Sequence, residues 1–290
     1  MAQAENSYYV PHGSHWPIFG SVAVCTLLVG MANYLNGTSW GGNMALVGFG
    51  LLVIMLFGWF GTVVKESRAG LYNAQVDVSF RWGMFWFIFS EVMFFAAFFG
   101  ALFYARNYSL PWLSGEGSGA ITNMFLYEGF EASWPSAANG PGNVGGEYKP
   151  MGAWGLPAIN TALLLSSGVT LTWAHHALKA GHRAQLIIGL FLTVALGAIF
   201  MACQVLEYKE AYEHYGLTLG SGIYGTTFFM LTGFHGFHVT IGAIILAVIL
   251  FRCMSGHFSS DNHFAFEAAA WYWHFVDVVW LGLFVFVYLV

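Results

Sequence analysis

Three ionisable side chains, Glu267, His274 and Asp277, interrupt the last apolar stretch of the chain, residues 265–290. At ~100° per residue of α-helix, these side chains and Trp271 fall within an arc of about 120°. A charged group that faces lipid at bilayer depth costs several kcal/mol, so the polar stripe must face protein or water. The spacing therefore predicts a helix inside a packed bundle, with the stripe as part of an interior polar network.

Glu91 is the clearest candidate for proton chemistry. It follows Arg81 by ten residues, which is about 15 Å along a helix axis and therefore near the middle of a bilayer. Ionisable groups at that depth often serve a functional pathway, so one interpretation is a proton relay or a ligand pathway. The other is a structural carboxyl that is hydrogen-bonded to a neighbouring helix. The residues alone leave both open.

His235 and His238 are three residues apart, so they lie on one face of a helix. One interpretation is structural hydrogen bonding between packed helices, which the small residues around them would allow. The other is ligation of a metal or haem. Metal binding needs further ligands, and neither a thiolate nor a second His-x-x-His pattern offers them. We therefore place both histidines in the interior polar network.

Two further polar groups lie toward the ends of apolar stretches. His175 and His176 point ~100° apart on a helix, so they cannot both serve one site. Glu207, Glu210 and Glu213 follow one another at three-residue spacing, which predicts a solvated helix face. Docking of a basic soluble partner is the alternative use of these carboxylates.

The sequence contains no CxxC, HExxH, GxSxG or P-loop motif. Its cysteines have neither disulfide nor zinc spacing, so we expect small apolar packing residues at Cys25, Cys203 and Cys253. These observations predict no self-sufficient active site in this chain.

Composition defines the elements that must position these side chains. Of the 290 residues, 58% are hydrophobic and only 8% are charged, whereas soluble domains carry about 25% charged residues. The net charge of −5 gives no sign of nucleic-acid binding. The chain is therefore expected to be an all-α polytopic membrane protein. Seven apolar stretches are long enough to cross ~30 Å of hydrocarbon: 17–35, 43–64, 81–105, 156–179, 185–207, 223–252 and 265–290.

Basic residues near the span ends predict the orientation. One side has six, on short connections, namely Lys65, Arg68, Arg81, Lys179, Arg183 and Arg252. The other side has three, namely Arg106, Lys149 and Lys209. The first side is therefore expected to be cytoplasmic, with the N-terminus there and the C-terminus outside.

Three parts are expected along the chain. Residues 1–64 form a two-helix bundle, residues 65–80 a cytoplasmic connection, and residues 81–290 a five-helix bundle. The last contains a long outer loop, residues 106–155, rich in Gly, Pro and Trp. This loop is either a decorated surface loop or a lid docked on a neighbouring subunit.

The chain resembles subunit III of the haem-copper cytochrome c oxidases. The similarity is dense over 81–105 and 156–290 and looser over 1–80. The blocks that carry it are Arg81–Met84, Phe87–Phe95, Thr172–Leu178, Gln204–Tyr208, Tyr224–Phe229, Thr232–His238 and Phe266–Trp280.

This resemblance implies seven helices, two against five, separated by a V-shaped cleft filled with lipid. It implies no haem and no metal in this chain, because the haems and copper belong to partner subunits I and II. Subunit I is then the main contact and cytochrome c the electron donor, with small extra subunits or a supercomplex as further partners. Subunits of this family bind phospholipid, support proton uptake, protect the complex from inactivation during turnover, and are candidates for O2 entry.

Particular residues take roles from the same resemblance. Glu91 matches the carboxyl at the cleft, a candidate for the proton or O2 pathway. Trp59, Glu66 and Arg252 match residues near lipid headgroups. The length of 106–155 favours a bacterial cytoplasmic membrane over the mitochondrial inner membrane.

Three other protein classes compete with this interpretation. A quinol oxidase subunit would typically lack the first two helices, which are present here. A stand-alone proton-coupled transporter would use Glu91 and Asp277 as its relay, but such proteins usually show repeats and broken helices. A haem-bearing redox protein would need histidines on facing helices at matching depth.

Overall fold

The computed structural model describes residues 8–10, 13–135 and 147–289. Residues 1–7, 11–12, 136–146 and 290 lie outside the described residues. The expectations for the start of the chain, the middle of the outer loop and the last residue of the final span are therefore not addressed there. In the described parts, the regular structure is helical throughout.

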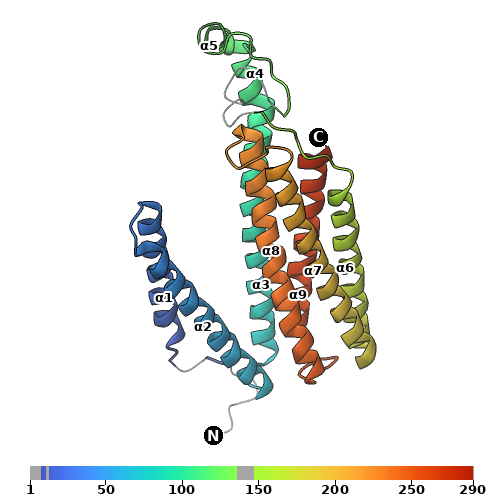
Figure 1. Ribbon diagram of the computed structural model, residues 1–290. Coiled ribbons are helices and arrows are strands. Elements are labelled where there is room, and N and C mark those ends of the chain that lie inside the picture. Colours follow the sequence, from blue (N-terminus) through green and yellow to red (C-terminus); the bar gives the residue numbers. More distant parts are fainter. Residues whose placement is uncertain (1–7, 11–12, 136–146, 290) are drawn as a thin grey trace. The chain divides into compact units, whose positions relative to one another are not determined.

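Each expected span coincides with a helix (Figure 1). The helices are α1 (Trp16–Leu35), α2 (Gly41–Arg68), α3 (Ala74–Tyr104), α6 (Leu156–Lys179), α7 (Arg183–Glu213), α8 (Gly222–Met254) and α9 (Phe264–Leu283). A π-helical segment, Phe284–Leu289, continues α9. The all-α class is confirmed.

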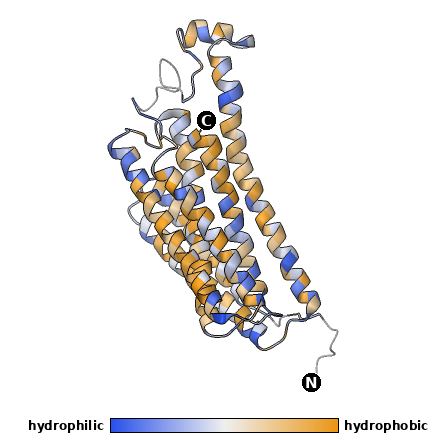
Figure 2. Ribbon diagram, turned by 90° about the vertical axis from the view of Figure 1, so that its right-hand side faces the viewer, coloured by the Kyte–Doolittle hydropathy of each residue, from blue (hydrophilic) through white to orange (hydrophobic). Residues whose placement is uncertain are grey.

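Six of these helical segments are long and apolar enough to cross a membrane, among those that the structure describes. Hydrophobic residues dominate most of the helix length in Figure 2, with hydrophilic residues toward the ends and connections. The exception is α6, which has 24 residues but a more polar sequence. The architecture is that of an integral membrane protein, and the crossing by α6 is considered under the proposed function.

The connections differ from those expected. The helix predicted to end at 105 continues through a π-helical segment, Ala105–Ser109, and α4 (Leu110–Leu113). It stops only before Gly115, whose φ of 100° suits glycine. The segment that follows holds a 3₁₀ turn at Gly117–Gly119 and α5 (Ala120–Leu126).

The connection between α2 and α3 is also shorter than the predicted 65–80. It comprises residues 69–73, because both helices extend past their apolar spans. The chain divides into two compact units, Met1–Trp82 and Gly83–Val290, so the division falls inside α3. We call them unit 1 and unit 2.

In unit 1, α1 and α2 pack closely through glycines. A Cβ added at Gly30 would lie 2.3 Å from the backbone nitrogen of Ala45, and one at Gly48 would lie 2.3 Å from that of Leu27. Such approach is the usual way in which membrane helices gain van der Waals contact. The surface around this seam is largely apolar, and only 11% of the apolar window of each helix is buried.

Gly48→Val is expected to destabilise unit 1, because the new side chain would overlap the backbone of α1 and force the helices apart. Overpacking of this kind costs about 1–3 kcal/mol. Gly50→Val is the matched control, since a Cβ at Gly50 meets nothing within 4 Å. Thermal unfolding of the purified protein in mild detergent measures the effect. Equal melting temperatures for the two variants would disprove the glycine seam.

In unit 2, α6, α7, α8 and α9 form a closed four-helix bundle, in which each helix packs mainly against two neighbours. Trp273 of α9 is fully buried in it. Its ring leaves no room for a Cβ at Gly197 of α7 or Gly242 of α8, and its Nε1–H donates to Ser167 Oγ of α6 at 2.8 Å. One side chain thus contacts all three other helices of the bundle.

Aromatic side chains attach the unit 2 part of α3 to this bundle. Phe94 stands edge-on to Phe234 of α8, with ring centroids 5.0 Å apart. Phe95 is 2% exposed and lies 6.0 Å from Phe275 of α9, centroid to centroid. These contacts bring the middle of α3, which carries Glu91, against α8.

Candidate functional site

Glu91 and His238 form a direct pair between α3 and α8. Glu91 Oε2 lies 2.8 Å from His238 Nε2, and His238 Nδ1 lies 2.6 Å from the carbonyl oxygen of Phe234. Both side chains are mostly buried, with 22% of the Glu91 side chain and 10% of the His238 side chain exposed. The two residues that the sequence placed in separate helices therefore belong to one site.

The hydrogen bonds determine where protons can sit. A carbonyl oxygen only accepts, so His238 Nδ1 carries a hydrogen that it donates to Phe234. The short contact to Glu91 then needs a second proton, either on the carboxyl or on His238 Nε2. The pair is a neutral acid and imidazole in the first case and an ion pair in the second. Either way, one proton is shared between two side chains.

Aromatic rings surround this pair. The His238 ring lies 5.1 Å from Phe95, 5.9 Å from Phe237 and 6.4 Å from Tyr272, measured between centroids. Such walls keep water sparse and strengthen the electrostatic interaction between the two groups.

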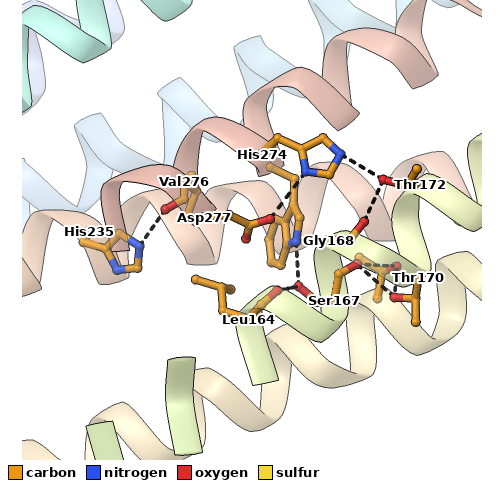
Figure 3. Close-up of polar contacts among 11 residues, drawn as sticks. Leu164, Ser167, Gly168, Thr170, Thr172, His235, His274, Val276 and Asp277 are labelled. Atoms are coloured by element: carbon orange, nitrogen blue, oxygen red, sulfur yellow. Dashed lines mark hydrogen bonds and ion pairs between the residues drawn. The ribbon is translucent and has the colours of Figure 1, made fainter. Parts of the chain in front are cut away.

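A second group joins α9 to α6. Figure 3 shows His274 between Asp277 and Thr172. His274 Nδ1 lies 3.5 Å from Asp277 Oδ2, and His274 Nε2 lies 3.4 Å from Thr172 Oγ1. Asp277 is buried against Gly168, whose Cβ position its carboxylate would block. The His274 side chain, by contrast, is 45% exposed.

His235 is buried in the bundle and faces a different partner from His238. Its Nε2 lies 3.2 Å from the carbonyl oxygen of Val276 on α9, as Figure 3 shows. Its ring packs against Phe200 and Trp280. The two histidines of α8 therefore make hydrogen bonds to different partners. This arrangement favours the structural interpretation over ligation of one metal ion by both.

Glu267 belongs to a third group, with His175 of α6 and His263. The sequence interpretation passed over His263, although its spacing of four residues from Glu267 was a usable signal. The residues predicted as one interior network thus fall into three groups by their contacts, one around His238, one around Asp277 and one around Glu267, with His235 bonded to the α9 backbone.

The expectation of a solvated acidic face is wrong for Glu207. This residue is fully buried and accepts a hydrogen bond of 2.5 Å from Tyr288 Oη. Its helix position faces the π-helical end of α9, which the three-residue spacing did not reveal. Glu210 and Glu213 lie nearer the surface, where Glu210 accepts a bond from Tyr215 and Glu213 lies 3.9 Å from Lys209.

The three residues expected to contact lipid headgroups lie in different environments. In unit 1, Glu66 accepts hydrogen bonds from Tyr72 Oη at 2.7 Å and Tyr9 Oη at 3.1 Å. Burial, and then the Glu66 carboxylate, raise the pKa of Tyr72. Trp59 is 47% exposed. In unit 2, the guanidinium of Arg252 lies 4.4 Å above the Phe258 ring.

These observations define a polytopic α-helical membrane protein in which buried acid–histidine pairs join the helices. Comparison with known families identifies it further. The family model for cytochrome c oxidase subunit III matches residues 6–111 and 120–290. The chain belongs to the cytochrome c oxidase subunit III family, and the resemblance seen in the sequence is confirmed.

Individual relatives agree with this family. The chain is 39% identical to cytochrome c oxidase subunit 3 of Cyprinus carpio over 289 residues, which is 99% of this chain and 98% of the relative. It is 41% identical to cytochrome c oxidase subunit 3 of Prototheca wickerhamii over 285 residues, 98% of this chain and 97% of the relative. These relatives are eukaryotic, so the predicted preference for a bacterial membrane finds no support.

Proposed function

We propose that this chain is the non-catalytic subunit III of a terminal haem-copper cytochrome c oxidase. In that complex the haems and copper lie in subunits I and II, and cytochrome c supplies electrons. The chain binds phospholipid, supports proton uptake and protects the complex from inactivation during turnover, with a further role in O2 entry. Membership of the family over nearly the whole chain supports the assignment to the complex.

The Glu91–His238 pair is the observation that carries the proton part of this proposal. Its shared proton can be released when the charge of the surroundings changes, and imidazole can take it up again. A structural hydrogen bond between α3 and α8 would not need two titratable partners. The pair therefore serves as a local proton store for proton uptake by the complex.

We include α6 as a seventh membrane crossing. Its 24 residues span about 36 Å at 1.5 Å per residue. Several of its hydroxyl groups bond inside unit 2, such as Thr161 with Trp280 and Thr170 with Thr193, so they do not face hydrocarbon unpaired. Seven crossings, with the basic ends of α2, α6 and α8 on the cytoplasmic side, leave the N-terminus cytoplasmic.

The two-plus-five helix arrangement and its lipid-filled cleft remain part of the proposal. The large apolar surface of α1 and α2 supports lipid contact for these helices. Trp59 and Glu66 in unit 1 and Arg252 in unit 2 are the headgroup candidates. A guanidinium is well suited to phosphate because it can donate two parallel hydrogen bonds.

The face formed by α6 and α9 is the proposed contact with subunit I. His274 and Thr172 are exposed there, next to Val169, which is 70% exposed, and Trp173, which is 41% exposed. In contact with lipid, this pair of polar side chains would border hydrocarbon at an energetic cost, whereas a partner helix can add hydrogen bonds to it. Because the chain belongs to a family of oxidase subunits, another subunit of the same complex, subunit I, is the proposed partner.

An optical spectrum of what co-purifies with the tagged chain in mild detergent tests this function. We expect reduced-minus-oxidised haem bands, together with larger subunits in equal amount. Oxidation of cytochrome c, rather than quinol, by the same preparation would identify the electron donor. A colourless chain that purifies alone would refute the proposal and favour a stand-alone transporter.

A further inference from the structure

We propose that His175, His263 and Glu267 form a binding site for a divalent transition metal ion, best matched by Zn²⁺. Their ligand atoms all lie within 4.8 Å of one another. The site lies where α6 ends and α9 begins, at the lower end of the bundle in Figure 1. This proposal goes beyond the role in an oxidase, and it departs from the expectation that the chain carries no metal site.

Two of the three distances between the ligand atoms are close to those around a tetrahedral ion. Zinc bonds to imidazole nitrogen and carboxylate oxygen are about 2.0–2.2 Å long, so ligand atoms around a tetrahedral zinc lie about 3.3–3.6 Å apart. Glu267 Oε1 lies 3.2 Å from His263 Nε2 and 3.7 Å from His175 Nε2. The two histidine nitrogens lie within 4.8 Å of each other, so the side chains would close around a bound ion to bring all three atoms to bonding distance from one centre.

The hydrogen bonds prepare His263 as a ligand. Its Nδ1 lies 3.1 Å from the carbonyl oxygen of Ser259, so Nδ1 carries a hydrogen, and in the neutral ring Nε2 carries the lone pair. Metal-binding histidines usually donate their other N–H in this way. In that form the lone pair faces a carboxylate oxygen 3.2 Å away, and a proton or a metal cation between the two atoms relieves their repulsion.

The two histidine nitrogens that face Glu267 have no hydrogen-bond partner among the described residues. His175 Nε2 and His263 Nε2 are inaccessible to solvent, and neither makes a hydrogen bond in the described part of the chain. Unpaired buried polar atoms are rare in native proteins, and a bound ion would satisfy both of these nitrogens at once. A water molecule would be the fourth ligand, because zinc is commonly held by three protein side chains and one water.

The chemistry of the ligands selects the ion. Two imidazoles and one carboxylate suit zinc, whereas Mg²⁺ and Ca²⁺ prefer sets made of oxygen atoms. His263 directly precedes α9, Glu267 lies in the first turn of α9, and His175 lies near the end of α6. A bound ion would therefore clamp the start of α9 to the end of α6.

Zinc content tests the site. The purified protein, with whichever subunits accompany it, is treated with a chelator, dialysed against micromolar zinc and analysed by mass spectrometry for zinc per chain. The variants are His263→Gln and Glu267→Gln, and His176→Gln is the control, because His176 is an exposed histidine next to His175. We expect each cluster variant to bind one zinc fewer than the wild type, and the control to bind as many as the wild type.

Equal zinc content in all four proteins would overturn the proposal. Anomalous X-ray scattering at the zinc edge from the wild-type protein covers the case in which a variant fails to fold. We expect a peak about 2.0–2.2 Å from the two Nε2 atoms and the carboxylate. A wild-type protein without such a peak would show that the three side chains interact only with one another.

Discussion

Trp273→Ala is expected to lower the thermal stability of the purified protein more than any other single change considered for this chain. The indole is fully buried, and it fills the space left by the glycines at 197 and 242. Truncation leaves a cavity and costs about 3–5 kcal/mol. It also removes the Nε1–H that bonds Ser167 at 2.8 Å, leaving a buried hydroxyl without that donor.

Trp271→Ala is the matched control for this experiment. Trp271 lies two residues earlier on α9 and is 36% exposed, so its truncation leaves no enclosed cavity. Melting curves in the same detergent compare the two variants. If the Trp273→Ala and Trp271→Ala proteins had the same melting temperature, the bundle would not be organised around Trp273.

Glu91→Gln is expected to leave assembly and haem content unchanged while it slows proton uptake or shortens the active lifetime of the oxidase several-fold. The amide can still donate a hydrogen bond to His238 Nε2, so the contact between α3 and α8 survives. It cannot release a proton at any accessible pH. The initial rate of O2 consumption and its decay during sustained turnover measure the two effects.

Glu213→Gln controls for the loss of a carboxylate, because Glu213 lies at the end of α7 with its side chain 55% exposed. Complete loss of O2 reduction in a correctly assembled Glu91→Gln complex would contradict an accessory role. If the Glu91→Gln complex had the O2 consumption rate and the active lifetime of the wild type, the Glu91–His238 pair would be only a structural contact.

The helices could be predicted from the sequence because their signal is local. Runs of apolar residues interrupted by few charges predict spans, and all seven expected spans coincide with helices. The ends of the helices were less predictable than their existence. Polar residues such as Arg106 and Asn107 continue a helix as readily as they end one, so α3 extends past the expected boundary to α4.

The pairing of side chains could not be predicted, because it depends on how the helices rotate against one another. Glu91 and His238 are 147 positions apart, and only the packing of α3 on α8 brings them together. For Glu207 the sequence predicted exposure to solvent, whereas the side chain is buried. Its neighbours in sequence suggested solvent, but Tyr288, 81 positions later, covers it.

The glycine seam of unit 1 also has a consequence for how the protein is made. The turn between α1 and α2, residues 36–40, is short, and the contacts along Gly30 and Gly48 lie within this pair. Chains are synthesised from the N-terminus, and parts with their own contacts can form early. The pair is therefore able to enter the bilayer and close as a helical hairpin while the ribosome is still translating unit 2.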